Sequence, residues 1–307
     1  MPASGAALVS EIHRCGYVAL VGRPNVGKST LLNRLLGQKI SITSPKPQTT
    51  RHQILGIKTL SHAQIIYVDT PGLHAYARKA LNRALNQAAS SALFDVDVAV
   101  FLVEASRWSA EDEQVLNKLR PSGVPVFLAV NKIDKLHSKS ELLPVLQSLS
   151  EKFDYAGVVP ISGLKGDNLD ALEGRVLEHL PVAPPLFPHD QVTDRSERFL
   201  AAELIREKLF RRLGKELPYG LTVEIESFLE EDKLLRINGL IWVERASQKK
   251  IVIGQHGSML KAVGSEARAD MQKIFGKKIY LELWVKVKEG WADDERALHS
   301  LGYDSGR

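Results

Sequence analysis

Gly22-Arg-Pro-Asn-Val-Gly-Lys-Ser29 is the stretch that decides the fold, because a glycine, four spacer residues and Gly-Lys-Ser form the pattern of a phosphate-binding loop. Glycines let the backbone approach a phosphate closely and point its N–H groups inward. In such a loop Lys28 reaches the β- and γ-phosphates, and the Ser29 hydroxyl is a ligand of Mg²⁺. The N-terminus of the following helix adds its dipole. The pattern therefore predicts a nucleoside triphosphate site between a strand and a helix.

The residues around this loop alternate between short apolar runs and amphipathic stretches. Continuous apolar runs separated by helices indicate a parallel sheet covered on both faces. Residues 54–59 add an edge strand, expected to be antiparallel because only a short turn separates it from the next run. The prediction is an α/β P-loop domain with a doubly wound, mostly parallel sheet. Its other strands are expected at 17–21, 65–68, 98–103, 124–130 and 158–161, and its helices at 29–36, 79–93, 110–119, 139–153 and 168–180.

A proline-rich segment divides the chain. Four prolines between residues 181 and 188 cannot continue a helix or a central strand, so a semi-rigid linker is expected there. Beyond it the order of elements becomes α+β. The expected divisions are an N-terminal tail (1–14), the nucleotide-binding domain (15–181), the linker (182–194) and a second domain (195–307). The second domain's elements are expected at 197–213, 221–229, 234–243, 251–275, 279–287 and 291–301, with breaks in the fourth at Gly254, Gly257 and Gly264.

Composition excludes several classes of protein. Hydrophobic residues make up 44% and charged residues 25% of the 307 residues, which excludes wholesale disorder. The single cysteine, Cys15, excludes an internal disulfide and a cysteine-based metal site, and this fits a reducing, cytoplasmic location. No apolar run approaches the ~18 residues that a membrane span needs, so we expect a soluble protein or one bound only at a membrane surface.

Charge is distributed unevenly along the chain. The net charge is +5, but residues 12–94 hold eleven Lys and Arg against one acid, Asp69. A field of one sign concentrates anions, so this stretch is expected to handle phosphates. Asp69-Thr-Pro-Gly72 follows an expected strand, and a carboxylate alone among cations is best explained by a metal ion. We therefore expect Asp69 to hold Mg²⁺ through its water shell and the Gly72 N–H to contact the γ-phosphate.

Two further motifs point to guanine. Asp134 of Asn131-Lys-Ile-Asp134 can accept hydrogen bonds from guanine N1–H and its exocyclic amine, a pair of donors that adenine lacks at that edge. Lys132 would lie along the base. Ser162-Gly163-Leu164 offers a backbone N–H to guanine O6. If Asp134 played no part, a P-loop ATPase or kinase would be the alternative, and competition by ATP against labelled GTP would decide.

These motifs, in this order, resemble the translation-factor-type GTPases, and longer strings resemble the Era family of bacterial GTPases. The strings include Lys39-Ile-Ser-Ile-Thr-Ser44 and Gln48-Thr-Thr-Arg-His52 in the first half, and Leu217-Pro-Tyr219 and Ile237-Asn-Gly-Leu240 in the second. The resemblance spans about residues 16–303. It departs at Gly163, where the family usually has alanine. It implies an Era-type GTPase domain that hydrolyses GTP to GDP and phosphate.

The resemblance also implies roles for single residues. The polar loop 44–52 is expected to be a mobile switch in which Thr50, or its neighbour Thr49, joins Ser29 and Asp69 as a ligand of Mg²⁺. The expected catalytic residues are Lys28, Thr50, Gly72 and Asn25. The expected GTP-binding set is Gly22, Arg23, Pro24, Asn25, Val26, Gly27, Lys28, Ser29, Thr30, Asp69, Thr70, Pro71, Gly72, Leu73, Asn131, Lys132, Ile133, Asp134, Ser162 and Gly163.

Leu73 stands where many GTPases place a glutamine that orients the attacking water. Leucine cannot hydrogen-bond to water, so slow intrinsic hydrolysis is expected and another group must help. Asn25 resembles the residue that, in related GTPases, positions a monovalent cation beside the phosphates. K⁺ is therefore a second candidate cofactor besides Mg²⁺.

Gly254-Gln-His-Gly257 is a GxxG sequence, which by itself is weak evidence because residues 163–166 match the same spacing. Its context is stronger: residues 245–265 hold no acid, and apolar residues with helical spacing flank the loop. A helix–GxxG–helix with a basic rim lets a nucleic-acid backbone pass close over the glycines. The resemblance implies a type II KH domain that binds RNA through Lys249, Lys250, Gly254, Gln255, His256, Gly257 and Lys261.

The resemblance implies the 3′ region of 16S ribosomal RNA as the ligand and maturation of the 30S subunit as the process. The alternative is a signalling GTPase whose C-terminal module contacts protein or membrane. We also expect a monomer in the cytoplasm, with the inner face of the cell membrane as a further partner for peripheral binding. Residues 74–93 carry three bases and no acid, and we expect them to relay the nucleotide state to the basic face around Gly254–Gly257.

Overall fold

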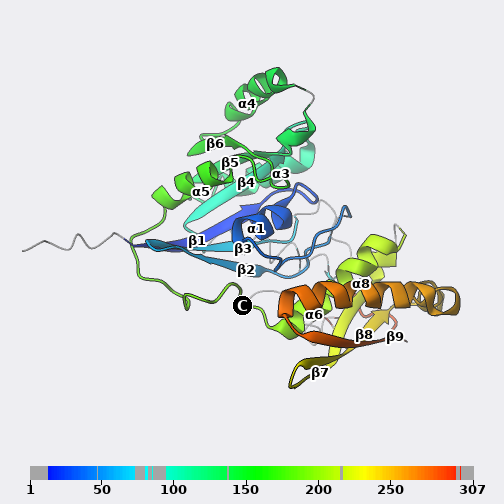
Figure 1. Cartoon of the computed structure of the whole chain (residues 1–307). Coiled ribbons are helices and arrows are strands. Elements are labelled where there is room, and N and C mark those ends of the chain that lie inside the picture. Colours follow the sequence, from blue (N-terminus) through cyan, green and yellow to red (C-terminus); the bar gives the residue numbers. More distant parts are fainter. Residues whose placement is uncertain are drawn as a thin grey trace, which may run out of the picture.

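The computed structural model has two domains joined by an extended segment (Figure 1). The structure describes residues 13–294, apart from 47, 73–79, 82–84, 86–94, 137 and 215–216, and it also describes residue 298. The expected helices at 79–93 and 291–301 therefore lie largely outside the described residues. No helix in the described ranges is both long and apolar enough to cross a bilayer.

A six-stranded sheet forms the first domain, in the order β2-β3-β1-β4-β5-β6. The β2–β3 pair is antiparallel and all other pairs are parallel, which confirms the predicted fold and its antiparallel edge. Because the order reverses at β1, the loop after β1 lies at the topological switch point, where open α/β sheets bind ligands. The strands are β1 (Arg14–Val21), β2 (Ile54–Thr59), β3 (Ala63–Asp69), β4 (Val98–Glu104), β5 (Val126–Asn131) and β6 (Gly157–Pro160).

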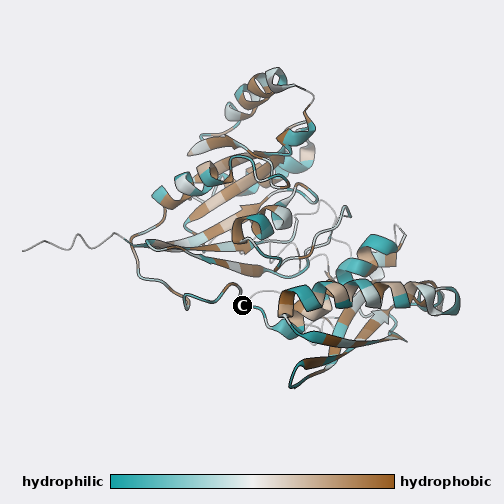
Figure 2. Cartoon of the chain, viewed as in Figure 1, coloured by the Kyte–Doolittle hydropathy of each residue, from teal (hydrophilic) through white to brown (hydrophobic). Residues whose placement is uncertain are grey.

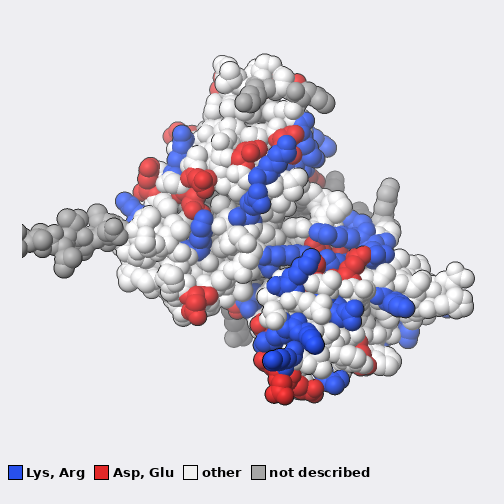
Figure 3. Space-filling view, viewed as in Figure 1, with Lys and Arg blue, Asp and Glu red and all other residues white. Residues whose placement is uncertain are grey.

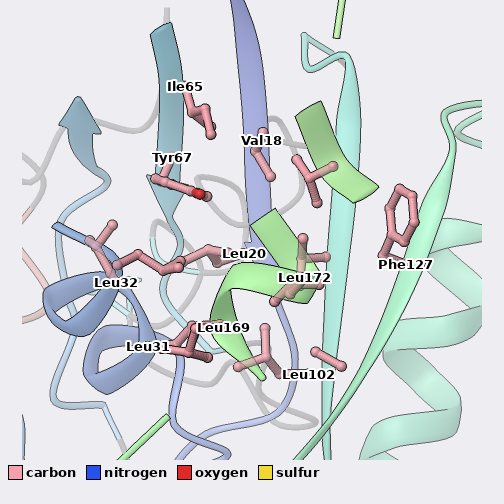
Figure 4. Close-up of a cluster of buried hydrophobic side chains, with 14 of the residues drawn as sticks. Val18, Leu20, Leu31, Leu32, Ile65, Tyr67, Leu102, Phe127, Leu169 and Leu172 are labelled. Atoms are coloured by element: carbon pink, nitrogen blue, oxygen red, sulfur yellow. The ribbon is translucent and has the colours of Figure 1, made fainter. Parts of the chain in front are cut away.

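Helices cover both faces of this sheet, and the strands are apolar on both sides (Figure 2). Alternate residues of β1 serve different cores: Val18 and Leu20 pack with α1 and α5, whereas Ala19 and Val21 pack with α3. Figure 4 shows side chains of the first core meeting from β1, β3, β4, β5, α1 and α5. The helical elements are α1 (Lys28–Leu36), α3 (Ala110–Leu119), η1 (Ile133–Lys135), η2 (Lys139–Glu141), α4 (Leu142–Ser150) and α5 (Leu169–Glu178).

The proline-rich segment is not a free spacer. It runs from the start of β1 past the edge strand β2 (Figure 1) and pairs with both strands at isolated points. The Ile57 N–H donates to the Val192 carbonyl at 2.8 Å, and Gln64 Nε2 donates to the Phe187 carbonyl at 2.9 Å. Prolines donate no N–H, but their neighbours still pair with an open strand edge. The segment is therefore held along the first domain, and its role as a semi-rigid linker stays a prediction.

The second domain packs helices on one face of a three-stranded sheet. β7 and β8 are antiparallel, and β8 and β9 are parallel, which is the order expected for a type II KH domain. The elements are α6 (Glu197–Arg212), η3 (Leu217–Gly220), β7 (Leu221–Glu231), β8 (Leu234–Val243), α7 (Ala246–Ile253), η4 (Gln255–Gly257), α8 (Ser258–Phe275) and β9 (Lys278–Val287).

The predicted break at Gly264 is wrong, because this glycine lies inside the continuous helix α8. A Cβ atom there would lie 3.5 Å from the Leu283 side chain of β9, which is ordinary contact, so the helix packs closely on the sheet at this point. The breaks at Gly254 and Gly257 are confirmed. Both have positive φ, 75° and 78°, a region that side chains other than glycine rarely adopt.

Candidate functional site

The phosphate-binding loop connects β1 to α1 and encloses a lysine. Lys28 is buried, and its Nζ donates to the carbonyls of Gly22 at 2.8 Å and Arg23 at 3.1 Å. Burial lowers the pKa of Lys28 to about 8, and the charge of Asp69 opposes that shift. The loop therefore presents one cation, supported by backbone carbonyls, at the switch point of the sheet.

Three oxygen-bearing side chains meet beside this lysine. Ser29 Oγ lies 2.8 Å from Thr50 Oγ1 and donates to Asp69 Oδ2 at 2.8 Å. Ser41 also donates to Asp69 Oδ2 at 2.8 Å, and it was not among the expected site residues. The other carboxylate oxygen, Oδ1, is buried and accepts no hydrogen bond from any described residue. Burial raises the pKa of Asp69, against the effects of Lys28, Ser29 and Ser41.

Hydroxyl and carboxylate oxygens are the donors that Mg²⁺ prefers. The orphaned Oδ1 of Asp69 and the adjoining hydroxyls of Ser29 and Thr50 therefore fit a Mg²⁺ ion. The structure also separates the two candidate threonines. Thr50 faces Ser29, whereas Thr49 Oγ1 donates to the Lys46 carbonyl at 2.7 Å.

Gly72 lies against the phosphate-binding loop. A Cβ atom at Gly72 would lie 2.9 Å from Cγ of Pro24 and 3.0 Å from its Cα and N, so any larger residue would push the two segments apart. Both residues line the pocket at this end of the sheet, which has a volume of about 90 Å³. Leu73 lies outside the described residues, so its expected role stays a prediction.

The base motifs are joined by Asn131 at the end of β5. Its Nδ2 donates to the Val26 carbonyl at 2.8 Å, and its Oδ1 accepts from the N–H groups of Lys132 at 2.8 Å and Gly163 at 2.9 Å. The buried side-chain amide of Asn131 is thus hydrogen-bonded both to the phosphate-binding loop and to the segments expected to bind guanine. The Gly163 N–H, expected to face guanine O6, donates to Asn131 in this structure.

Asp134 is oriented by a neighbouring hydroxyl. Ser162 Oγ donates to its Oδ1 at 2.6 Å and accepts from the Lys165 N–H at 3.0 Å. The Lys132 side chain bridges back to the phosphate-binding loop, because its Nζ donates to the Asn25 carbonyl at 2.8 Å. The predicted base residues are therefore brought together at the ends of β5 and β6.

Arg23 extends this network away from the pocket. It pairs with Glu104 at 2.8 Å and with Asp112 at 3.2 Å, and Glu104 also accepts from Lys132 at 3.1 Å. Arg23 is thus an anchor between the phosphate-binding loop, β4 and α3. The side chains of Val26, Thr70 and Ile133 likewise point into the protein, so only their backbone could face a nucleotide.

Sequence reasoning missed several residues that line the pocket. Ile42, Thr43, Ser44 and Gln48 join the expected residues Pro24, Asn25, Gly27, Lys28, Ser29, Thr30, Thr49, Thr50 and Gly72. These residues lie within the two Era-like segments, 39–44 and 48–52. The resemblance of those segments to the family could therefore have predicted them.

We expect Gly163→Ala to leave the nucleotide site intact and to raise the free energy of unfolding by about 0.4–1 kcal/mol. Gly163 does not have a positive φ. A Cβ atom there would meet Asn131 and Leu31 at 3.5 Å, which is ordinary contact. Alanine therefore reduces the freedom of the unfolded chain without strain. Urea unfolding measures the change, and a loss of stability would contradict it.

A groove beside the GxxG loop forms the candidate nucleic-acid interface. It has a volume of about 460 Å³ and runs between α8 and β9. Of the expected RNA-binding residues, Lys250, Gln255, His256 and Lys261 are exposed and Lys249 is half-buried. The structure adds Gly264, Ser265 and Arg268, which line the groove with Gly257 and Lys261. These three residues follow Lys261 by three, four and seven positions, which places them on the same face of a helix. That spacing was the sequence signal that could have predicted them.

Comparison with known proteins identifies the family. A family model described as "50S ribosome-binding GTPase" matches residues 17–132, and one described as "KH domain" matches residues 216–292. The GTPase Era of Ectopseudomonas mendocina is 61% identical over 294 residues, covering 96% of this chain and 98% of that protein. The chain belongs to the Era family of GTPases. The Era protein of Pseudomonas aeruginosa is 59% identical over 94% of this chain and 95% of its own length.

Two solved Era structures match almost the whole chain. One is Era in complex with MgGDPNP and nucleotides 1506–1542 of 16S ribosomal RNA; it has a TM-score of 0.92 and 41% identity, covering 95% of this chain and 99% of that one. The other is an Aquifex aeolicus Era variant bound to GDP and AlF₄⁻, with a TM-score of 0.91 and 42% identity, covering 94% and 99%. The chain is thus a GTPase of the Era family with a C-terminal KH domain.

Proposed function

We propose that this GTPase is a GTP-hydrolysing switch that binds the 3′ region of 16S ribosomal RNA and assists maturation of the 30S subunit. One observation carries the proposal: a relative that matches 95% of this chain binds nucleotides 1506–1542 of that RNA together with MgGDPNP. The groove of about 460 Å³ beside Gly257, rimmed by Lys261 and Arg268, supports the same ligand class.

We assign Mg²⁺ to Ser29, Thr50 and Asp69, with Asp69 acting through the ion's water shell. When bound, the ion would neutralise charge that develops on the β- and γ-phosphate oxygens. Lys28 supplies a second positive charge to the same oxygens. The backbone N–H of Gly72 is placed beside the loop by its contact with Pro24 and can donate to the γ-phosphate.

We assign recognition of the guanine base to Asp134, and the Lys132 side chain would lie along the face of that base. Ser162 fixes the carboxylate of Asp134 through the 2.6 Å hydrogen bond, which leaves its second oxygen for guanine. A buried carboxylate that pairs with the two donors of guanine discriminates strongly against adenine. This arrangement favours GTP over the ATPase and kinase alternative.

The domain boundaries 15–181 and 195–307 stay a proposal, supported by two separate hydrophobic cores. The KH match favours RNA over the alternative of a signalling GTPase whose second domain contacts protein or membrane. A monomeric state, a cytoplasmic location and peripheral binding to the inner face of the cell membrane stay predictions.

We expect K⁺ to stimulate GTP hydrolysis more than Na⁺ and Asn25→Ala to remove the difference. Asn25 Nδ2 donates to the Pro45 carbonyl at 2.8 Å, while its Oδ1 accepts no hydrogen bond from the described residues and could face a cation. A cation beside the phosphates would stabilise developing charge as an arginine does. Hydrolysis rates in KCl and NaCl at equal ionic strength measure the effect. If the native chain shows equal rates in the two salts, the cation site is absent.

The proposal is tested by the affinity of the full chain for an oligonucleotide of the 16S rRNA 3′ end, compared with a scrambled oligonucleotide of the same composition. Phosphate contacts alone would bind both and weaken together with added salt. We expect the native sequence to be preferred at every salt concentration. Equal affinities would reject the assigned RNA.

A further inference from the structure

The KH domain is hydrogen-bonded to the loop that carries Thr50. Lys46 Nζ donates to the carbonyls of Phe210 and Leu213 at the end of α6. Arg206 of α6 donates to the Thr49 carbonyl at 2.5 Å. Two residues before Thr50 are therefore bonded to the other domain, and Figure 3 shows Lys and Arg, with Asp and Glu among them, where the two domains meet.

The side chain of Arg51, by contrast, extends from the loop into the KH domain. Its guanidinium donates to the carbonyls of Leu221 at 2.8 Å and Pro218 at 3.0 Å, just where β7 begins. Its Cζ lies 5.4 Å from the centre of the Phe210 ring, and Cζ of Arg206 lies 5.1 Å from the same centre. One aromatic ring of α6 thus packs with both arginines.

The two arginines are buried, and Arg206 is fixed by an ion pair. Arg51 and Arg206 are 2% and 1% exposed. Glu203 fixes Arg206 through hydrogen bonds of 2.7 and 2.6 Å. A buried guanidinium that is paired in this planar way has little freedom, so it holds its carbonyl partner in one place.

A second set of contacts holds the start of the same loop. Lys39 pairs with the buried Glu207 of α6, and the Thr43 N–H donates to Glu207 at 3.3 Å. Arg211, one turn further along α6, donates to the Thr43 carbonyl at 3.1 Å. The loop between α1 and β2 is therefore bonded to α6 and its C-terminal end at Lys39, Thr43, Lys46 and Thr49.

We propose that Arg206 and Arg51 are positioning residues for GTP hydrolysis: the KH domain holds Thr50 at the metal through them. The inference rests on the proposed assignment of Thr50 to Mg²⁺. A loop hydroxyl binds a metal better when its backbone is already ordered, because less conformational entropy is lost on binding. The contacts of Arg206 and Arg51 between the KH domain and the loop, here called the clamp, order the loop from outside the GTPase domain.

The test is the Mg²⁺ dependence of GTP hydrolysis by the full chain. The main variant is Arg206→Gln with Glu203→Gln, which removes the hydrogen bond to the Thr49 carbonyl together with the carboxylate that pairs with Arg206. We expect the half-saturating Mg²⁺ concentration to rise at least fivefold. Affinity for GDP should stay within twofold, because contacts of such a loop with the metal depend on the γ-phosphate. The matched control is Arg212→Gln, an arginine of the same helix that pairs with Glu266 of α8, and it should behave as wild type.

Thermal unfolding checks that the main variant folds. If it does not, Lys46→Gln gives the same readout without disturbing a buried ion pair, and at least a twofold rise is expected. An unchanged Mg²⁺ requirement in a folded variant, or an equal loss of GTP and GDP affinity, would overturn the clamp.

Thr50→Ala separates this inference from the assignment on which it rests. In that background the clamp substitutions should raise the Mg²⁺ requirement by less than twofold, because both act through one contact. If Thr50→Ala itself leaves the Mg²⁺ dependence unchanged, the metal assignment fails. If Thr50→Ala raises the requirement and the clamp variants do not, only the clamp fails.

Discussion

Asp134→Ala is expected to abolish the preference for GTP over ATP while the phosphate contacts persist. The carboxylate accepts from two guanine donors that adenine lacks, and buried pairing of this kind discriminates by roughly 10⁴–10⁵. Competition of unlabelled ATP and GTP against labelled GTP, in the native chain and in the variant, measures the change. We expect the large preference of the native chain to fall to near unity.

Ser162→Ala is the matched comparison, because it removes the hydroxyl that orients Asp134 and keeps the carboxylate. It should lower the affinity for GTP modestly and keep the preference. If the Asp134 variant still selected GTP by orders of magnitude, the base site would have to lie elsewhere.

Gln255→Asp with His256→Asp is expected to reduce affinity for the 16S rRNA 3′ end on the order of 10²-fold, because like charges placed together at an interface cost several kcal/mol. Both side chains are exposed between Gly254 and Gly257, so the change should leave the fold intact. His256 has a φ of 51°, which aspartate tolerates better than most residues.

The control for that experiment adds the same two charges elsewhere, as Gln147→Asp with Ser148→Asp on the exposed side of α4. Fluorescence anisotropy with a labelled RNA at one salt concentration compares the three proteins. An affinity lost equally in both variants would reflect net charge alone, and would contradict contact at the GxxG loop.

Local patterns predicted much of the fold. The bounds of β2, α3 and β8 match their expected ranges. α7 begins at Ala246, five residues before the expected helical stretch, since residues 246–250 carry no apolar stripe. α8 continues through Gly264 because packing against β9 outweighs the weak helix propensity of glycine.

The nucleotide site could be predicted because its chemistry lies in contiguous motifs. Thr49 and Thr50 could not be separated, since their sequence context is the same and only the fold places one hydroxyl beside Ser29. The clamp could not be predicted either. Arg206 lies 157 residues from the carbonyl that it holds, and no periodicity links two such distant segments.

The route between the domains was expected to run through residues 74–93, most of which lie outside the described residues. Leu81 and Leu85 of this segment are buried with Trp291 and Leu298. The loop from residue 39 to residue 51 makes a second junction, which carries Thr50, the proposed metal ligand. A change in nucleotide at this junction can therefore reach α6 directly.

We expect GTP binding and RNA binding to be coupled through this junction. The most direct measurement is the affinity of the full chain for the 16S rRNA 3′ end with a non-hydrolysable GTP analogue, with GDP and without nucleotide, at one fixed salt concentration. Coupling between sites is typically ~1–3 kcal/mol, so affinities that differ by about 5–150-fold are expected, with RNA changing the affinity for the GTP analogue by the same factor. Three equal affinities would contradict the account and leave two independent domains on one chain.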